Sequence, residues 1–202
     1  MKKLLGILLM VSGFAFAATG WFSDYVLINK NGSGEIYYWI GADPSFGTKL
    51  DSYDFGGVSS LVITGCDMKY WSDTQDRTGG AFYYIIKKVS DGSTVVPMTE
   101  VIWTQTGPTG NDYRGELSGL TINLLTGLED ATTYQLHILA KSWGIPSGQG
   151  DSWLSNGGAN YVATFTTPDG QVPITLASFT AKALNGAVSV TWVTESESEN
   201  AA

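Results

Sequence analysis

Residues 125–140, LTGLEDATTYQLHILA, decide the fold class of this chain. From Tyr134 onward, the apolar residues Leu136, Ile138 and Ala140 recur at every second position, which places them on one face of a β-strand. The preceding glycine and polar residues mark a turn into that strand. The stretch therefore predicts a half-buried strand that follows a tight corner.

The Leu-x-Gly-Leu corner at 125–128, followed by Tyr134, resembles the tyrosine corner of fibronectin type III and immunoglobulin-like sandwiches. That resemblance implies an all-β fold, an antiparallel Greek-key β-sandwich. The chain contains roughly eight strand-like runs separated by turn signals at short intervals, as such folds require.

Runs of β-branched and aromatic residues predict the other strands. The clearest local signal is Asn31-Gly32 between two such runs, which predicts a hairpin. Pro97 indicates an edge strand or a bulge, and the short run 68–71 indicates an edge strand. Residues 106–115 have the Gly, Pro and Asn content of an exposed loop. The predicted strands are 25–29, 35–40, 60–64, 68–71, 81–89, 94–104 and 120–125.

Residues 151–167, DSWLSNGGANYVATFTT, close the predicted sandwich. Tyr161, Ala163 and Phe165 alternate with polar residues and should face the core. We expect 151–160 to be an exposed loop and 168–173, which begins and ends with proline, to be a stiff linker.

The N-terminus has the three parts of an export signal. Two lysines follow Met1, residues 4–14 are apolar, and Ala15-Phe16-Ala17 matches a small-x-small cleavage site. The apolar run is too short for a stable membrane anchor. We expect a signal peptide helix over 1–17 and a mature chain that begins at Ala18.

Composition and charge narrow the function classes. The 202 residues include 25 glycines, with 12% aromatic and 15% charged residues, a balance typical of all-β extracellular proteins. Loss of Lys2 and Lys3 would lower the 11 basic groups to 9 against 19 acidic ones, a net charge of −10. Such a surface repels phosphate backbones, so we expect no nucleic-acid partner. Cys66 is the only cysteine, and we expect it to be a buried apolar residue.

No catalytic constellation is apparent. His137 is the only histidine; it falls on the outward face of its strand, where we expect it to be solvated, and no nucleophile motif accompanies it. We therefore predict no enzyme and no catalytic residues. A hydrolase using two loop carboxylates is a third hypothesis, and the same acidic loops would suit a structural Ca²⁺ ion, although no EF-hand motif is present and no cofactor or metal ligand is predicted. The loop carboxylates are Asp51, Asp54, Asp73, Asp76, Asp112 and Asp151.

Aromatic residues beside polar loops suggest a glycan-binding role. Sugar rings have apolar faces edged by hydroxyls, so a flat aromatic ring flanked by Asp or Asn acceptors suits them. For each aromatic residue, packing within the sandwich is the competing interpretation, and Trp39 and Trp103 are assigned to packing because they lie inside predicted strands. The candidate ligand-binding residues are Trp71, Asp73, Tyr113, Trp143, Trp153, Asn156 and Asn160.

The last part of the chain resembles a known export-associated module. Residues 172–181, the alternating Val188, Val190 and Trp192, and the acidic run 194–200 are similar to the module that precedes the C-terminal sorting domain in proteins of the type IX secretion system. The run NGGANYVATF at 156–165 likewise resembles the end of an uncharacterised β-sandwich type found at the N-termini of such proteins. These resemblances imply a secreted or outer-surface protein of a Gram-negative bacterium that reaches its secretion machinery through a C-terminal domain absent from this sequence.

We therefore expect a signal peptide (1–17), a β-sandwich (18–167), a linker (168–173) and the truncated start of a second β-module (174–202). Two strands cannot form a sandwich, so the sequence is expected to be a fragment of a longer protein. The leading hypothesis is a non-catalytic secreted or cell-surface sandwich that binds glycan or another extracellular ligand through its end loops. The alternative is a structural or adhesive spacer that presents a downstream domain.

Overall fold

The computed structural model of the chain describes residues 19–41, 46–73, 77–144, 150–170, 176–184 and 187–194. The predicted signal peptide lies outside the described residues, as do Asp76 and residues 171–173 of the predicted linker.

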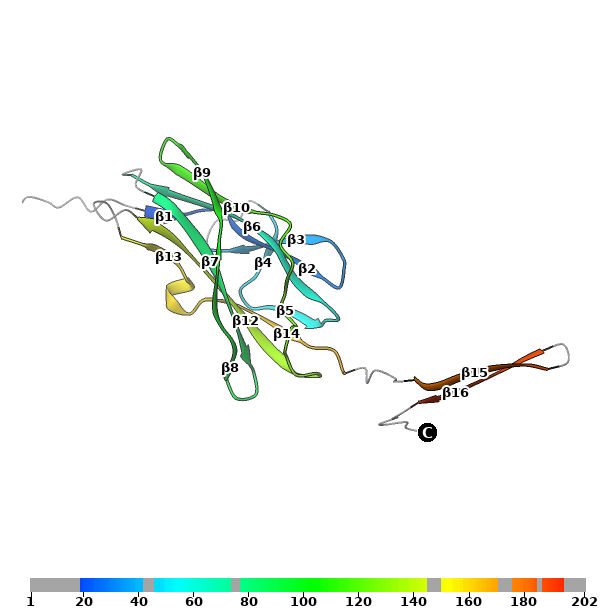
Figure 1. Cartoon of the computed structure of the whole chain (residues 1–202). Coiled ribbons are helices and arrows are strands. Elements are labelled where there is room, and N and C mark those ends of the chain that lie inside the picture. The colour runs from blue at the N-terminus through cyan, green and yellow to red at the C-terminus, as the bar shows by residue number, and fades with distance from the viewer. Residues whose placement is uncertain are drawn as a thin grey trace, which may run out of the picture.

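The main body consists of two β-sheets packed face to face (Figure 1). The larger sheet has eight strands in the order β4-β3-β2-β6-β10-β9, with β1 and β11 also paired to β6. Its strands are β1 (Thr19–Trp21), β2 (Asp24–Lys30), β3 (Glu35–Ile40), β4 (Thr48–Lys49), β6 (Leu61–Ser72), β9 (Thr104–Thr109), β10 (Asp112–Leu117) and β11 (Ile122–Asn123).

The smaller sheet has six strands in the order β5-β14-β12-β7-β8, with β13 also paired to β12. A short 3₁₀ turn, η1 (Asn156–Gly158), separates its last two strands. The strands are β5 (Tyr53–Gly57), β7 (Arg77–Lys88), β8 (Thr94–Ile102), β12 (Thr133–Gly144), β13 (Ser152–Leu154) and β14 (Tyr161–Thr166).

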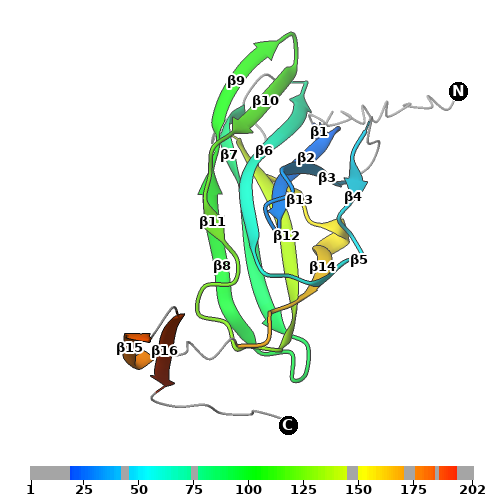
Figure 2. The ribbon, with the colours of Figure 1, turned by 90° about the vertical axis from the view of Figure 1, so that its right-hand side faces the viewer.

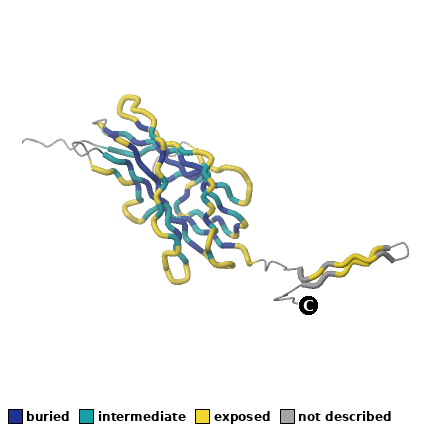
Figure 3. The backbone as a smooth tube through the Cα atoms, in the orientation of Figure 1, coloured by how far each residue is buried: buried dark blue, intermediate teal, exposed yellow. Residues whose placement is uncertain are grey.

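The predicted all-β sandwich is confirmed. Its central strands pair antiparallel, and two outer pairings, β3 with β4 and β5 with β14, are parallel. Between the sheets lies a continuous apolar core (Figure 3). Tyr161, Ala163 and Phe165 of β14 face that core with 7%, 0% and 0% exposure, as their alternation predicts.

The corner before β12 has the predicted geometry. The Tyr134 hydroxyl accepts a hydrogen bond of 3.0 Å from the backbone N–H of Glu129, so the tyrosine ties the turn that precedes its own strand. Its ring is buried and stacks on Phe165 of the neighbouring strand, with 5.8 Å between ring centroids. The first hairpin, β2 with β3, is likewise confirmed.

Several predictions about strands and loops were wrong. The predicted strand 120–125 is reduced to the two residues of β11, and the predicted exposed loop 151–160 contains β13 with the buried Leu154. The runs 60–64 and 68–71 are parts of one central strand, β6, which pairs with β2 on one side and β10 on the other. The predicted loop 106–115 is instead largely the hairpin β9–β10, in which Asp112 pairs with Thr109. Figure 2 shows this hairpin at one end of the sandwich.

The chain passes directly from one sheet to the other at both sides of the sandwich. Residues 50–52 connect β4 of the larger sheet to β5 of the smaller one, and Trp103 alone connects β8 to β9. Each crossing buries a large apolar side chain, Leu50 with 0% exposure and Trp103 with 4%. The two sheets are therefore joined along both lateral edges.

Strands β15 (Leu176–Leu184) and β16 (Ala187–Thr194) form an antiparallel hairpin of their own. Within the described ranges, they pair only with each other. Val188 and Val190 are 66% and 43% exposed. The assignment of this hairpin to a second module stays a prediction.

Candidate functional site

Most of the predicted aromatic residues lie in strands at one end of the sandwich, where β6 and β12 end and β10 begins. Trp71 and Tyr113 belong to β6 and β10 of the larger sheet, and Trp143 and Trp153 to β12 and β13 of the smaller sheet. Tyr113 and Trp153 were predicted to lie in the loops 106–115 and 151–160, and that prediction was wrong. The structure places them on different sheets, so they do not form one surface.

Trp153 is the most exposed predicted aromatic residue, with 47% of its side chain accessible. It is held by β13, which pairs with the last part of β12 so that Trp153 lies directly opposite Lys141. The Lys141 ammonium is 5.0 Å from the centre of the indole ring, and the Tyr83 ring lies 5.6 Å away at a tilt of 36°. Two neighbouring side chains thus fix the orientation of the ring.

Each of the two residues that contact this ring is bonded to a carboxylate. Asp151 makes an ion pair of 3.0 Å with Lys141, and its side chain remains 43% exposed. Glu100 of β8 accepts a hydrogen bond from the Tyr83 hydroxyl. We call Tyr83, Glu100, Lys141, Asp151 and Trp153 together the Trp153 shelf.

The shelf stands on a second apolar cluster, on the face of the smaller sheet that points away from the core. Ala81, Tyr83 and Leu139 are buried there, and Trp143 packs against them. Burial, followed by the hydrogen bond to Glu100, raises the pKa of Tyr83 above its ordinary value. The Tyr83 hydroxyl therefore stays protonated and donates to Glu100 within the shelf.

Sequence reasoning missed Tyr83, Glu100 and Lys141. The available signal was the period of two along β12, because Leu139, Lys141 and Trp143 all lie on the face opposite to Ile138 and Ala140. The pairing of β12 with β7 brings Tyr83 opposite Leu139. That pairing is a tertiary contact that no local pattern reveals.

Asn156 and Asn160 stabilise the turn that follows β13. Both have positive φ, 50° and 63°, in the left-handed region that asparagine tolerates. The Asn156 amide donates a hydrogen bond of 3.1 Å to the carbonyl oxygen of Asn160. These contacts give both residues a local structural role.

Tyr113 was predicted as an exposed ring, and this was wrong. Its side chain is 3% exposed and stacks on Tyr70 at 5.6 Å, with 5° between the ring planes. Its hydroxyl accepts a hydrogen bond from the buried Arg77 backbone at 3.4 Å. The residue belongs to the core, because the alternation of β10 turns it inward.

Trp71 lies on the outer side of β6, on the larger sheet. It is partly buried, and its indole covers Gly20 of β1, where an added Cβ would come within 2.2 Å of Nε1. Asp73 is exposed in the turn after β6. Trp71 and Trp153 therefore belong to opposite sheets of the sandwich.

His137 lies on the outward face of β12, as predicted, but the prediction that it is solvated was wrong. The residue is only 8% exposed. Its Nε2 is 3.3 Å from Oε1 of Gln135, and burial, with a contribution from Lys87, lowers the pKa of the imidazole. The outer face of this sheet is covered by its own large side chains, so outward orientation does not bring exposure.

Two of the loop carboxylates, Asp51 and Asp54, bind the closing strand β14. Asp51 accepts from the backbone of Val162, and Asp54 accepts from Gly56 and Thr164, beside β14. Asp112 and Asp151 lie on opposite sheets at the other end of the sandwich. Across the described ranges, no group of three or more His, Cys, Asp or Glu side chains could hold a metal ion.

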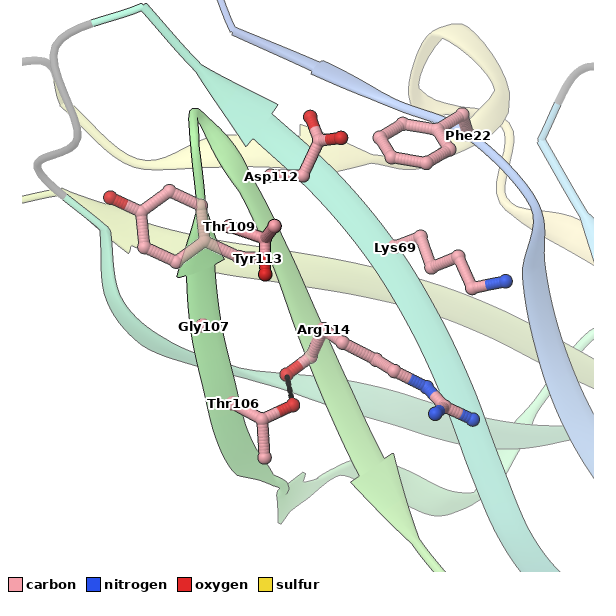
Figure 4. Close-up of a pocket in the computed structure, with 8 residues that line it drawn as sticks. All are labelled: Phe22, Lys69, Thr106, Gly107, Thr109, Asp112, Tyr113 and Arg114. Carbon is pink, nitrogen blue, oxygen red and sulfur yellow. Dashed lines mark hydrogen bonds between the residues drawn. The ribbon is translucent and has the colours of Figure 1, made fainter.

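A hollow lies on the larger sheet, beside the β9–β10 hairpin (Figure 4). It has a volume of about 330 Å³ and is lined by Phe22, Lys69, Thr106, Gly107, Thr109, Asp112, Tyr113 and Arg114. Sequence reasoning singled out none of these as a group, since they come from four separate segments.

None of the described residues form a helix long and apolar enough to cross a membrane. In comparisons with known proteins, no family model and no curated protein matches this chain.

Proposed function

We propose that this chain is a non-catalytic, secreted or cell-surface β-sandwich that binds glycan by stacking a sugar ring on the Trp153 shelf. The observation that carries the proposal is the half-exposed indole of Trp153, held in place by Lys141 and Tyr83. The secreted location is supported by the N-terminal lysines, apolar run and small-x-small site.

A fixed aromatic ring suits this task for two reasons. The apolar face of a pyranose ring gains from contact with a flat aromatic surface. A ring that is already oriented loses little conformational entropy when the ligand binds. Because Trp153 packs against Tyr83 and below the Lys141 ammonium, its orientation is set before a ligand arrives.

The carboxylates of the shelf favour a neutral sugar. Asp151 and Glu100 carry oxygens that accept hydrogen bonds from hydroxyl groups. The positive charge of Lys141 is balanced by Asp151, so the shelf keeps no free cation for an anionic ligand. We therefore expect neutral hexose chains to bind better than acidic ones.

A structural spacer is the second candidate. It is favoured by the burial of Tyr113 in the core and by the packing of Trp71 and Trp143 over Gly20 and Gly79. These three aromatic residues contribute to stability rather than to an open platform. Trp153 is the residue on which the two candidates differ.

The test compares Trp153→Ala with Phe46→Ala on an array of neutral glycans. Phe46 is a matched control because it is 53% exposed and stacks on Tyr25 of the larger sheet. We expect Trp153→Ala to weaken binding at least about tenfold, a loss of roughly 1.4 kcal/mol, and Phe46→Ala to leave it unchanged. Absence of binding by the wild type, or equal loss in both variants, would overturn the proposal in favour of the spacer.

A further inference from the structure

The hollow on the larger sheet lies where β6, β10 and β9 meet the segment between β1 and β2. Phe22 forms one wall, Lys69 comes from β6, and Asp112 and Arg114 come from β10 (Figure 4). Thr106 and Thr109 of β9 add hydroxyl groups. The hollow thus combines a flat aromatic ring, both signs of charge and neutral polar groups.

The charge of Arg114 is already balanced. Its guanidinium binds Asp67 through two hydrogen bonds, Nε to Oδ1 at 2.8 Å and an Nη atom to Oδ2 at 3.0 Å. It also lies 3.3 Å from a carboxylate oxygen of Glu116. Arg114 therefore forms a wall of the hollow and has little attraction left for an anion.

Lys69 lies directly opposite Arg114 across the β6–β10 pair. Because Arg114 is neutralised by Asp67 and Glu116, it adds little repulsion at Lys69. Within the described part of the chain, the Lys69 ammonium makes neither a hydrogen bond nor an ion pair. Only the backbone of this residue is bonded, with its N–H donating to Asp24 and its carbonyl oxygen accepting from Phe22. The ammonium can therefore pair with an anionic group from outside.

Asp112 is the diagonal neighbour of Lys69, because it lies opposite Trp71. The backbones of diagonal neighbours in a sheet are about 7–8 Å apart, and in the described part of the chain these two side chains form no ion pair with each other. Among the described side chains, the Asp112 carboxylate has no hydrogen-bonding partner either. Figure 4 shows Asp112 and Lys69 on two sides of the Phe22 ring, with the carboxylate and the ammonium apart.

We propose that this hollow binds a sugar unit that carries a carboxylate, such as a uronic acid residue. The ligand carboxylate would pair with Lys69, and its ring hydroxyls would donate to Asp112 while the ring lies against Phe22. The Phe22 ring offers a flat wall, and Thr106 and Thr109 offer hydroxyls, so a sugar fits better than a peptide end. The volume of about 330 Å³ is at the small end for ligand pockets, which suits one sugar unit.

This site is separate from the proposed function, since it lies on the other sheet and prefers an anionic sugar, whereas the Trp153 shelf prefers a neutral one. The experiment titrates the protein with trigalacturonic acid and with its methyl ester by calorimetry, at low salt. We expect the free acid to bind at least about tenfold more tightly than the ester, and this preference to weaken with added salt.

Lys69→Gln should abolish the preference for the free acid, whereas Lys69→Arg should keep it. Lys69→Gln should fold, because among the described residues the Lys69 ammonium makes no hydrogen bond or ion pair that would be lost; urea unfolding checks this. Lys49→Gln is the matched control, because Lys49 lies on β4 of the same sheet with 54% side-chain exposure, and it should behave like the wild type.

Equal binding of acid and ester, or equal losses in the Lys69 and Lys49 variants, would overturn the proposal. Tighter binding of a zwitterionic dipeptide than of the uronate would overturn the assignment to a sugar. Trp153→Ala should leave uronate binding intact while it removes binding of neutral glycan. That pair of readouts distinguishes failure of this site from failure of the shelf.

Discussion

Trp103 allows a quantitative test of how the two sheets are joined. Its ring lies between two glycines, one from each sheet. A Cβ on Gly115 of β10 would come within 2.4 Å of Trp103 Nε1, and one on Gly80 of β7 within 2.1 Å of Cζ2. The Gly80 Cβ would also lie 2.4 Å from the carbonyl oxygen of Lys141. The first clash involves the Trp103 ring alone, and the second also involves backbone.

Gly115→Ala should destabilise the protein by about 2–3 kcal/mol, the upper part of the range for overpacking, because the ring has no room to move toward Gly80. With an m-value of about 2 kcal/mol per molar urea, the unfolding midpoint should fall by roughly 1 M at unchanged slope. Trp103→Leu alone should cost about 2–4 kcal/mol, since it leaves a cavity between the sheets.

The double variants separate the two clashes. In Gly115→Ala combined with Trp103→Leu, the clash is removed, so the total cost should be at least about 1 kcal/mol below the sum of the single costs. Trp103→Leu should relieve less of the destabilisation caused by Gly80→Ala, because the Cβ added at position 80 would still clash with the carbonyl oxygen of Lys141. If the losses of unfolding free energy for Gly115→Ala and Trp103→Leu are strictly additive in urea unfolding, the prediction is wrong, because the Trp103 ring is then not held tightly between Gly80 and Gly115.

Three further predictions concern other parts of the chain. Burial raises the pKa of the Cys66 thiol to about 12, so iodoacetamide should modify native protein at pH 8 at least about a hundredfold more slowly than protein in urea; equal rates would contradict its burial. Burial also raises the pKa of Asp24 well above 3.8, so its stabilising contribution is full below that pH and is lost as pH rises through the higher folded-state pKa. Asp24→Asn should therefore remove part of the decline in unfolding free energy between pH 4 and pH 8, measured by urea unfolding, whereas parallel pH profiles would exclude this effect. Finally, amides of 176–194 should exchange with deuterium far faster than those of β6, β7 and β12, because a two-stranded hairpin is marginal in water; comparable protection by mass spectrometry would disprove it.

The features that could be predicted from the sequence are those set by local chemistry. Asn31-Gly32 predicts the first hairpin, because both residues tolerate the positive φ that its turn requires, 54° and 71°. The alternation of β14 predicts which side chains face the core. The corner before Tyr134 predicts a tight turn into the strand, and the structure shows in addition the hydrogen bond between Tyr134 and Glu129.

The continuous strand β6 could not be predicted, because its period of two changes phase. Leu27 and Ile28 of β2 pair with Gly65 and Ile63, so Thr64 is skipped by a bulge. The inward positions are therefore odd-numbered before the bulge and even-numbered after it. In the sequence this looks like two short strands with a break.

The candidate sites could be predicted only in part, for a related reason. Trp143 and Trp153 were selected, but both faces of the smaller sheet carry apolar side chains, so alternation does not tell the core face from the outer one. Tyr83 and Lys141 reach Trp153 through strand pairings between distant segments. The hollow beside Lys69 likewise depends on the register of β6 with β10.

The two crossings at residues 50–52 and at Trp103 also affect how the protein could associate with other molecules. Exposed edge strands invite pairing with other chains, and proteins limit this with short strands or with proline. Here one side ends in β4, of two residues, and β5, of five, while the long edge strands on the other side carry Pro97 and Pro108. On either side, a strand from another molecule would therefore find few long rows of free N–H and C=O groups to pair with. We expect association with other molecules to use the side chains on the faces of the sheets rather than backbone pairing at their margins.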